Sequence, residues 1–162
     1  MARMTFKAGD EFAIKLSKLA AGQEKIAKKA IYAASKVVAD KIKDNLNALP
    51  EEKFRNLKDG EQFTGVPERH KKDLIESFGI TPIETDRDGN WNAKIGFDGY
   101  GSVKTEKYPK GIPNQLLARS IESGSSVRKK KPFVRPAVTA TKKQAMKIMG
   151  EVIDKEIDKL IK

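Results

Sequence analysis

The chain has 162 residues and a formal net charge of +11, a size that fits one compact domain. It contains no cysteine, which excludes disulfides and cysteine-based metal sites. It has no apolar run long enough to span a bilayer, and its first six residues lack the apolar stretch of a secretion signal. We therefore expect a protein that is made in the cytosol and carries one modest core.

The positive charge is concentrated toward the C-terminus. Residues 128–162 contain 11 Lys or Arg residues and 4 Asp or Glu residues, a balance of +7. The other residues contribute only +4, and no acidic residue occurs between Glu122 and Glu151. A localised basic stretch attracts phosphate, anionic lipid or an acidic protein surface, and charge alone does not distinguish them.

Residues 9–48 have a helical pattern. Gly22 is expected to break or bend it, giving a short helix over 11–21 and a longer one over 23–46. Pro50 follows and ends the helix. The apolar residues of the longer helix recur at spacings of three and four: Ile26, Ala27, Ala30, Ile31, Ala34, Val37, Val38, Ile42 and Leu46.

The middle of the chain predicts a loop and a β-hairpin. Residues 50–72 are polar and contain turn residues, so they are expected to form an extended loop. A short helical turn over 72–78 follows. Residues 80–85 and 91–97 predict two strands joined by a turn at 86–90, and the second strand alternates cleanly between apolar and other residues.

The last third contains a second extended loop and a long helix. Residues 99–113 are expected to be flexible, and residues 114–123 fit either a helix or a strand. Residues 124–131 form a basic loop, and a helix starts near Pro132. The whole of 1–162 is therefore predicted to be a single α+β domain, a small antiparallel sheet packed by a long N-terminal and a long C-terminal helix.

No pattern predicts a catalytic, metal or cofactor site. The only histidine, His70, lies in a polar stretch and is expected to be solvated. The glycines of 96–101 leave a strand for a loop and lack the helix start that cradles phosphate. The acidic pairs Asp86/Asp88 and Glu51/Glu52 are explained by turn chemistry and by surface charge. We expect a protein that is not an enzyme and uses no cofactor.

The basic stretch allows several partners. The candidate contacts for DNA or a partner are Arg128, Lys129, Lys130, Lys131, Lys142 and Lys143. Phosphate binding through this stretch is one interpretation. Phe133 is the only aromatic residue within it, and no known DNA-binding motif is found there, which favours docking on an acidic protein surface. Membrane binding is less favoured, because the final helix mixes charges and lacks large aromatics.

One segment resembles a known family. It runs from Ala118 through Glu122, Gly124 and Ser125 to an unbroken Pro-Phe-Val-Arg-Pro-Ala run at 132–137, and a terminal helix follows. This pattern resembles the minor tail component, or tail-completion, family of long-tailed bacteriophages. The amphipathic N-terminal helix and the Lys-Asp-Leu-Ile-Glu-Ser segment at 72–77 are also similar to the family.

The resemblance implies a virion protein of the neck, where tail and head join. Such proteins form a ring, expected here to be a hexamer, between the tail terminator or tube and the head connector or stopper, with genome DNA in the lumen. The motif residues are then structural: Ala118, Glu122, Gly124, Ser125, Pro132, Phe133, Arg135, Pro136 and Ala137. Phe133 is expected to be buried, Gly124 to permit a sharp turn, and Arg135 to pair with Glu122. The alternatives are a nucleic-acid-binding phage protein that uses 128–147, and a host-directed or regulatory phage protein.

Overall fold

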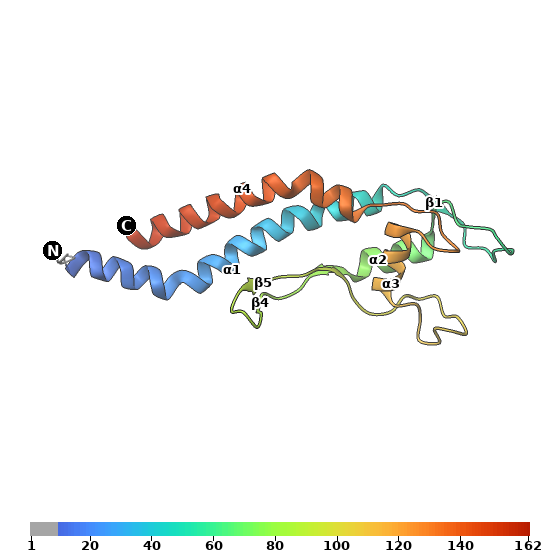
Figure 1. The fold of residues 1–162 in the computed structure, drawn as a ribbon, viewed down its shortest axis with the longest axis horizontal. Helices are drawn as coiled ribbons and strands as arrows, with labels where there is room; N and C mark the ends of the chain where they lie inside the picture. The colour runs from blue at the N-terminus through green and yellow to red at the C-terminus, as the bar shows by residue number, and fades with distance from the viewer. Residues whose placement is uncertain (1–9) are drawn as a thin grey trace, which may run out of the picture.

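The computed structural model describes residues 10–162, with side chains from residue 14 onward, so the expectation about the first six residues lies outside it. The helices are α1 (Asp10–Asn47), α2 (Glu68–Ser77), α3 (Asn114–Ser123) and α4 (Val134–Ile161). The strands are β1 (Glu51–Glu52), β2 (Val66–Pro67), β3 (Phe78–Ile80), β4 (Glu84–Thr85), β5 (Trp91–Asn92) and β6 (Ile95–Phe97). The molecule is elongated: α1 and α4 lie side by side, with the start of α1 near the end of α4, and α2, α3 and the long loops gather at the other end (Figure 1).

Three contacts along α1 and α4 show that the two helices run antiparallel. Gly22 lies against Leu160, the Lys29 ammonium bonds the Glu156 carboxylate at 2.7 Å, and the Asn45 amide donates to the carbonyl oxygen of residue 133 at 3.0 Å. As the residue number rises along α1, its partner's number falls along α4. The predicted α+β class, with a long N-terminal helix packed on a long C-terminal helix, is confirmed.

Gly22 does not break α1, which contradicts the prediction of two separate helices. Helix α1 continues from Asp10 to Asn47. A Cβ built on Gly22 would lie 2.7 Å from Cδ1 of Leu160, so the missing side chain lets the end of α4 approach. A glycine inside a helix costs about 0.5–1 kcal/mol relative to alanine, which is too little to end a helix that a neighbour packs against.

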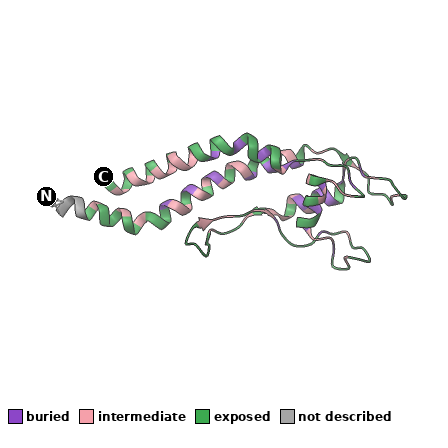
Figure 2. Cartoon of the chain, in the orientation of Figure 1, coloured by how far each residue is buried: buried purple, intermediate pink, exposed green. Residues whose placement is uncertain are grey.

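The core lies at the end of the molecule where α2, α3, β6 and the start of α4 meet the last turns of α1. Its buried residues are Ile42, Leu46, Val66, Leu74, Phe97, Leu117, Ala118, Ile121, Phe133 and Ala137. Figure 2 shows the buried residues gathered in this half, while the far ends of α1 and α4 are exposed or half-buried. Among the described side chains, buried positions on α1 begin at Ile26 and those on α4 end at Ala145.

The predicted hairpin is present, but each of its strands is interrupted. β3 pairs antiparallel with β6, and β4 pairs antiparallel with β5. Between them the Thr81 N–H donates to the Lys94 carbonyl at 2.8 Å, and the Lys94 N–H donates to the Thr81 hydroxyl at 2.9 Å. The second bond uses a side chain, and Pro82 has no N–H to give, so the ladder cannot continue. The turn at 86–90 is confirmed.

The two loops are more ordered than the sequence predicts. Within 50–72, β1 pairs parallel with β2, and α2 already begins at Glu68 rather than near residue 72. In the second loop, the Gly101 N–H donates to the Ile112 carbonyl at 2.8 Å, and the Ser102 N–H and hydroxyl both donate to Asp73. Residues 114–123, which fitted either a helix or a strand, are the helix α3.

Candidate functional site

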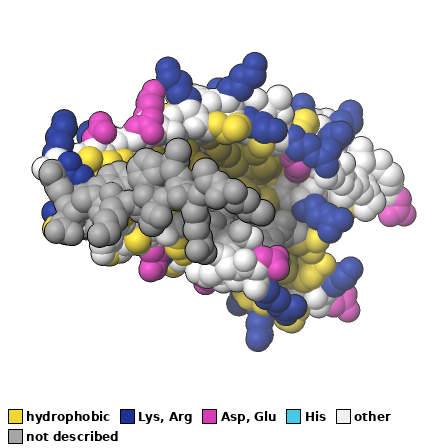
Figure 3. All heavy atoms as spheres, turned by 60° about the vertical axis from the view of Figure 1, so that its left-hand side comes forward, with side chains coloured by type: hydrophobic (Ala, Val, Ile, Leu, Met, Phe, Trp, Pro, Cys, Tyr) yellow, Lys and Arg dark blue, Asp and Glu magenta, His cyan; other side chains and the backbone are white. Residues whose placement is uncertain are grey.

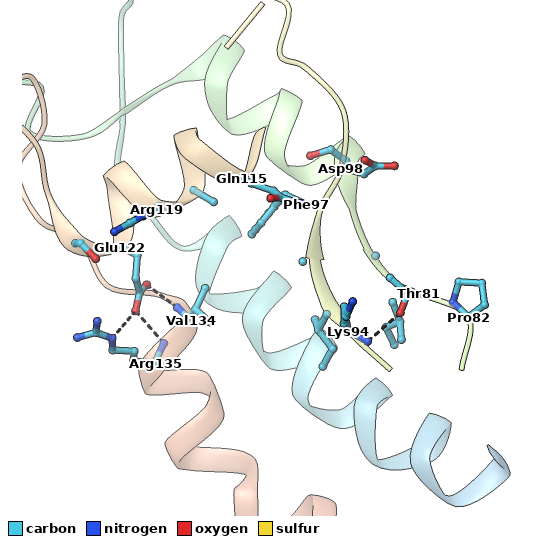
Figure 4. Close-up of a pocket in the computed structure, with 17 residues that line it drawn as sticks. Thr81, Pro82, Lys94, Phe97, Asp98, Gln115, Arg119, Glu122, Val134 and Arg135 are labelled. Atoms are coloured by element: carbon cyan, nitrogen blue, oxygen red, sulfur yellow. Dashed lines mark hydrogen bonds and ion pairs between the residues drawn. The ribbon is translucent and has the colours of Figure 1, made fainter. Parts of the chain in front are cut away.

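The junction between α3 and α4 is built around one carboxylate. Oε2 of Glu122 accepts the N–H groups of Phe133 at 2.7 Å and Val134 at 2.9 Å, and its Oε1 accepts the N–H of Arg135 at 3.0 Å. Figure 4 shows Glu122 reaching from α3 to the first turn of α4. The first N–H groups of any helix lack partners within the helix, and the residue before α4, Phe133, makes no side-chain cap. Glu122 therefore caps α4 from another helix.

The chain around this cap is fixed by its apolar and glycine residues. The Phe133 side chain is 1% exposed and lies edge-on to Phe97 with a centroid distance of 6.0 Å. Gly124 has φ +79°, a left-handed conformation that favours glycine, and a Cβ there would lie 3.2 Å from the Lys130 nitrogen. The expected burial of Phe133 and the sharp turn at Gly124 are both confirmed.

Glu122 is held as a carboxylate, and Arg135 assists from outside. Burial alone would raise the pKa of Glu122, but the N–H groups of Val134, Phe133 and Arg135, together with the Arg135 charge, lower it below its usual value. The expected ion pair exists, with Nε of Arg135 3.9 Å from Oε1 of Glu122. Because the Arg135 side chain is 75% exposed, the backbone bonds dominate this contact.

The other motif residues surround the junction. Ala118 on α3 and Ala137 on α4 are both buried. Ser125 and Arg128 bond each other's backbone, and the Ser125 carbonyl accepts the Gln62 amide at 2.8 Å. Pro132 precedes α4, and Pro136 lies in its first turn, where a proline is tolerated because the N–H has no helical acceptor. The motif thus joins α3, the basic loop and α4.

An open groove of about 990 Å³ lies beside this junction. One side is formed by α3 and the first residues of α4, and the other by the ribbon of β3 and β6 (Figure 4). Gly79 and Gly96 are paired across the ribbon, and a Cβ on either would meet nothing within 4 Å. The sequence analysis missed this groove. The available signal was Gly96 inside the second predicted strand, since a glycine within a strand often marks close approach by another backbone.

His70 is buried, which contradicts the expectation that it is solvated. Its side chain is 2% exposed, and its Nδ1 lies 2.7 Å from Nη2 of Arg128. The Phe54 ring packs edge-on to it at 5.7 Å. Burial and the Arg128 charge lower the pKa of His70 to about 4. The Arg128 guanidinium must donate in this pair, so His70 is neutral with its proton on Nε2.

Arg128 is likewise buried, so it does not belong to an exposed basic contact surface. It is 6% exposed and lies over the Phe63 ring at 5.4 Å. Lys129, Lys130, Lys142 and Lys143 are exposed, and Lys131 is half-buried. In Figure 3 the Lys and Arg side chains are spread around the visible surface rather than gathered in one patch. The structure therefore leaves five of the six predicted contact residues at least partly accessible.

Residues 10–162 contain no group of three or more His, Cys, Asp or Glu side chains placed to hold a metal ion. No helix within that range is both long enough and apolar enough to cross a membrane. Comparison of the chain with protein-family models, with curated proteins and with solved structures found no match to any of them.

Proposed function

We propose that the chain is a non-enzymatic structural protein of a tailed-phage particle, a subunit of the ring that joins tail and head. The proposal begins from the resemblance of residues 118–137 to the tail-completion family. Its partners are other copies of the chain, expected to be six in a ring, the tail terminator or tube below and the head connector or stopper above, with DNA passing through the lumen. The protein would then be made in the host cytoplasm and end in the virion.

The observation that supports the proposal best is the Glu122 cap. The resemblance links two short stretches, and the carboxylate of the first stretch accepts three N–H groups of the second. A sequence signature of a structural protein should consist of residues with structural roles. Glu122, Gly124 and Phe133 each have one, in capping, in turning and in filling the core.

Exposed apolar side chains on the two long helices are compatible with assembly of the chain into a larger particle. Large apolar side chains are exposed along α1 and α4, including Leu16 at 50%, Tyr32 at 55% and Met146 at 66%. Scattered apolar residues are common on surfaces, but here they lie on two long helices whose outer halves contact little else. A ring subunit would cover such positions with its neighbours.

A second candidate function is nucleic-acid binding through residues 128–147. The observation that favours it is the absence of acidic residues between Glu122 and Glu151, combined with exposed lysines at 129, 130, 142 and 143. Binding through phosphate contacts would weaken steeply as salt rises. The burial of Arg128 removes one of the six predicted contacts from this candidate.

The proposal can be tested by cryo-electron microscopy of tailed particles made with the gene intact, deleted or restored. We expect a ring of this chain at the neck, and separate heads and tails when the gene is deleted. Complementation by Glu122→Ala should be impaired, and complementation by the matched surface variant Glu76→Ala should be normal. If particles join normally without the gene, the proposal is wrong, and salt-dependent DNA binding becomes the next measurement.

A further inference from the structure

The groove beside α3 has an apolar wall on its ribbon side, lined by Ile80, Ile95 and Phe97. Gly79 and Gly96, paired between these residues, add no side chain to the opposite face of the ribbon. The Phe78 and Phe97 rings pack against each other in a tilted arrangement with their centroids 5.1 Å apart. A segment of another chain can lie along this wall, between the ribbon and α3.

The rim of the groove is basic. Lys94, Arg119 and Arg135 line it, together with the carboxylates Asp98 and Glu122. Glu122 is occupied by the N–H groups of α4. Figure 4 places Lys94 on the ribbon side and Arg119 and Arg135 on the helix side, so cations flank the groove on both sides.

The same chain presents an exposed segment of opposite charge. The tip of the β4–β5 hairpin, residues 84–90, contains Glu84, Asp86 and Asp88 against a single Arg87. Every residue of this tip is exposed. Its shape is fixed internally, because Oδ1 of Asp86 accepts the N–H groups of Asp88 at 3.0 Å and Asn90 at 2.8 Å. A narrow acidic turn that holds its shape loses little conformational freedom on docking.

We propose that the hairpin tip of one copy of the chain docks in the groove of a second copy. The acidic tip, residues 84–90, lies between Lys94 and Arg119 of the neighbour, along the ribbon wall of the groove. Tip and groove are different surfaces, so the contact is head-to-tail and repeats from copy to copy. That this contact closes into a ring rests on the proposed function; the contact itself rests on the charges and the groove.

Site-specific disulfide trapping tests the contact directly, because the natural chain has no cysteine. Copies carrying Arg87→Cys in the tip are mixed in a glutathione redox buffer with copies carrying Gln115→Cys, whose residue lines the groove. The matched control replaces Gln115→Cys by Gln144→Cys, an exposed glutamine on α4. We expect several-fold more cross-linked heterodimer with Gln115→Cys than with Gln144→Cys. Equal yields would overturn the proposal.

A charge exchange provides a second test that does not depend on a new thiol. One variant carries Lys94→Glu and Arg119→Glu in the rim, and the other carries Glu84→Lys and Asp88→Lys in the tip. Each alone places like charges at the contact, so its self-association by sedimentation velocity should weaken about tenfold or more. The equimolar mixture restores opposite charges and should associate as the natural chain does.

The mixture also controls for folding, because two misfolded variants would not restore association. A mixture that stays dissociated while both variants keep the helical circular-dichroism signal would overturn the docking of the tip. That outcome is distinguishable from failure of the proposed function. If particles show a neck ring but the mixture stays dissociated, the docking contact is wrong and the proposed function stands. Association without a neck ring keeps the contact and removes the phage role.

Discussion

Removing the Glu122 carboxylate is the sharpest perturbation of this fold. Glu122→Ala leaves three N–H groups at the start of α4 without their acceptor. Loss of an N-cap costs about 0.5–2 kcal/mol. The Phe133 residue is buried, so its N–H gains little water in exchange, which adds about 1–3 kcal/mol. We expect the free energy of unfolding to fall by roughly 3 kcal/mol.

Urea unfolding followed by circular dichroism measures this change. For a chain of this size, roughly 3 kcal/mol corresponds to a fall in Tm of about 6–12 °C. The control is Glu76→Ala, which removes an exposed glutamate whose ion pair with Lys72 spans 3.9 Å. That variant should change stability by less than about 0.5 kcal/mol. If the two variants were equally stable, the cap would contribute nothing and the reasoning would fail.

The same carboxylate gives a pH dependence of known sign. The pKa of Glu122 is lower in the folded chain than its ordinary value of 4.5, so the folded state favours the charged form. The contribution is complete above the ordinary value and is lost as the pH falls through the lowered one. Glu122→Gln should therefore flatten the acid limb of stability against pH. An unchanged acid limb would mean that the carboxylate is not held as the contacts indicate.

Three further changes test other parts of the fold. Phe133→Ala should cost about 3–5 kcal/mol in urea unfolding, because it empties a fully buried site. Gly111→Ala should cost more than about 1 kcal/mol, because φ is +108° and the new Cβ would collide with the Gly101 carbonyl. The single histidine, His70, should titrate near pH 4 by NMR, and Arg128→Met should raise its pKa. Because the folded chain disfavours the protonated imidazole, the free energy of unfolding should fall as the pH drops from 6.5 toward 4.

The long helices could be predicted because their signal is local. A stripe at spacings of three and four over more than twenty residues predicts a helix whatever it packs against, and α4 and the 23–46 part of α1 confirm this. The motif at 118–137 was also readable as a structural unit. What it did not reveal is the partner of Glu122: the sequence suggested the Arg135 side chain, and the structure adds three backbone N–H groups.

The errors share one cause, which is a partner that lies far away in the sequence. Gly22 was expected to break or bend the helix, but the helix continues through it and Leu160 from α4 lies against it. His70 lies among charged residues, yet it is buried by Arg128, which is 58 positions away. The groove needs α3 and the ribbon to meet, and no single segment encodes it. Local patterns were therefore enough to predict the helices, whereas the site depends on contacts between segments that are distant in the sequence.

The two halves of the molecule are held by different interactions, and the Glu122 junction lies between them. The core half is stabilised by fully buried apolar side chains such as Leu46, Leu74 and Phe133. Toward the other end, α1 and α4 meet through half-buried apolar side chains such as Leu160, which lies against Gly22, and through polar contacts such as Lys29 with Glu156. Exposed ion pairs contribute little, so the outer half depends on α4 leaving the core in the right direction. The cap sets that direction, because it fixes the first turn of α4 against α3.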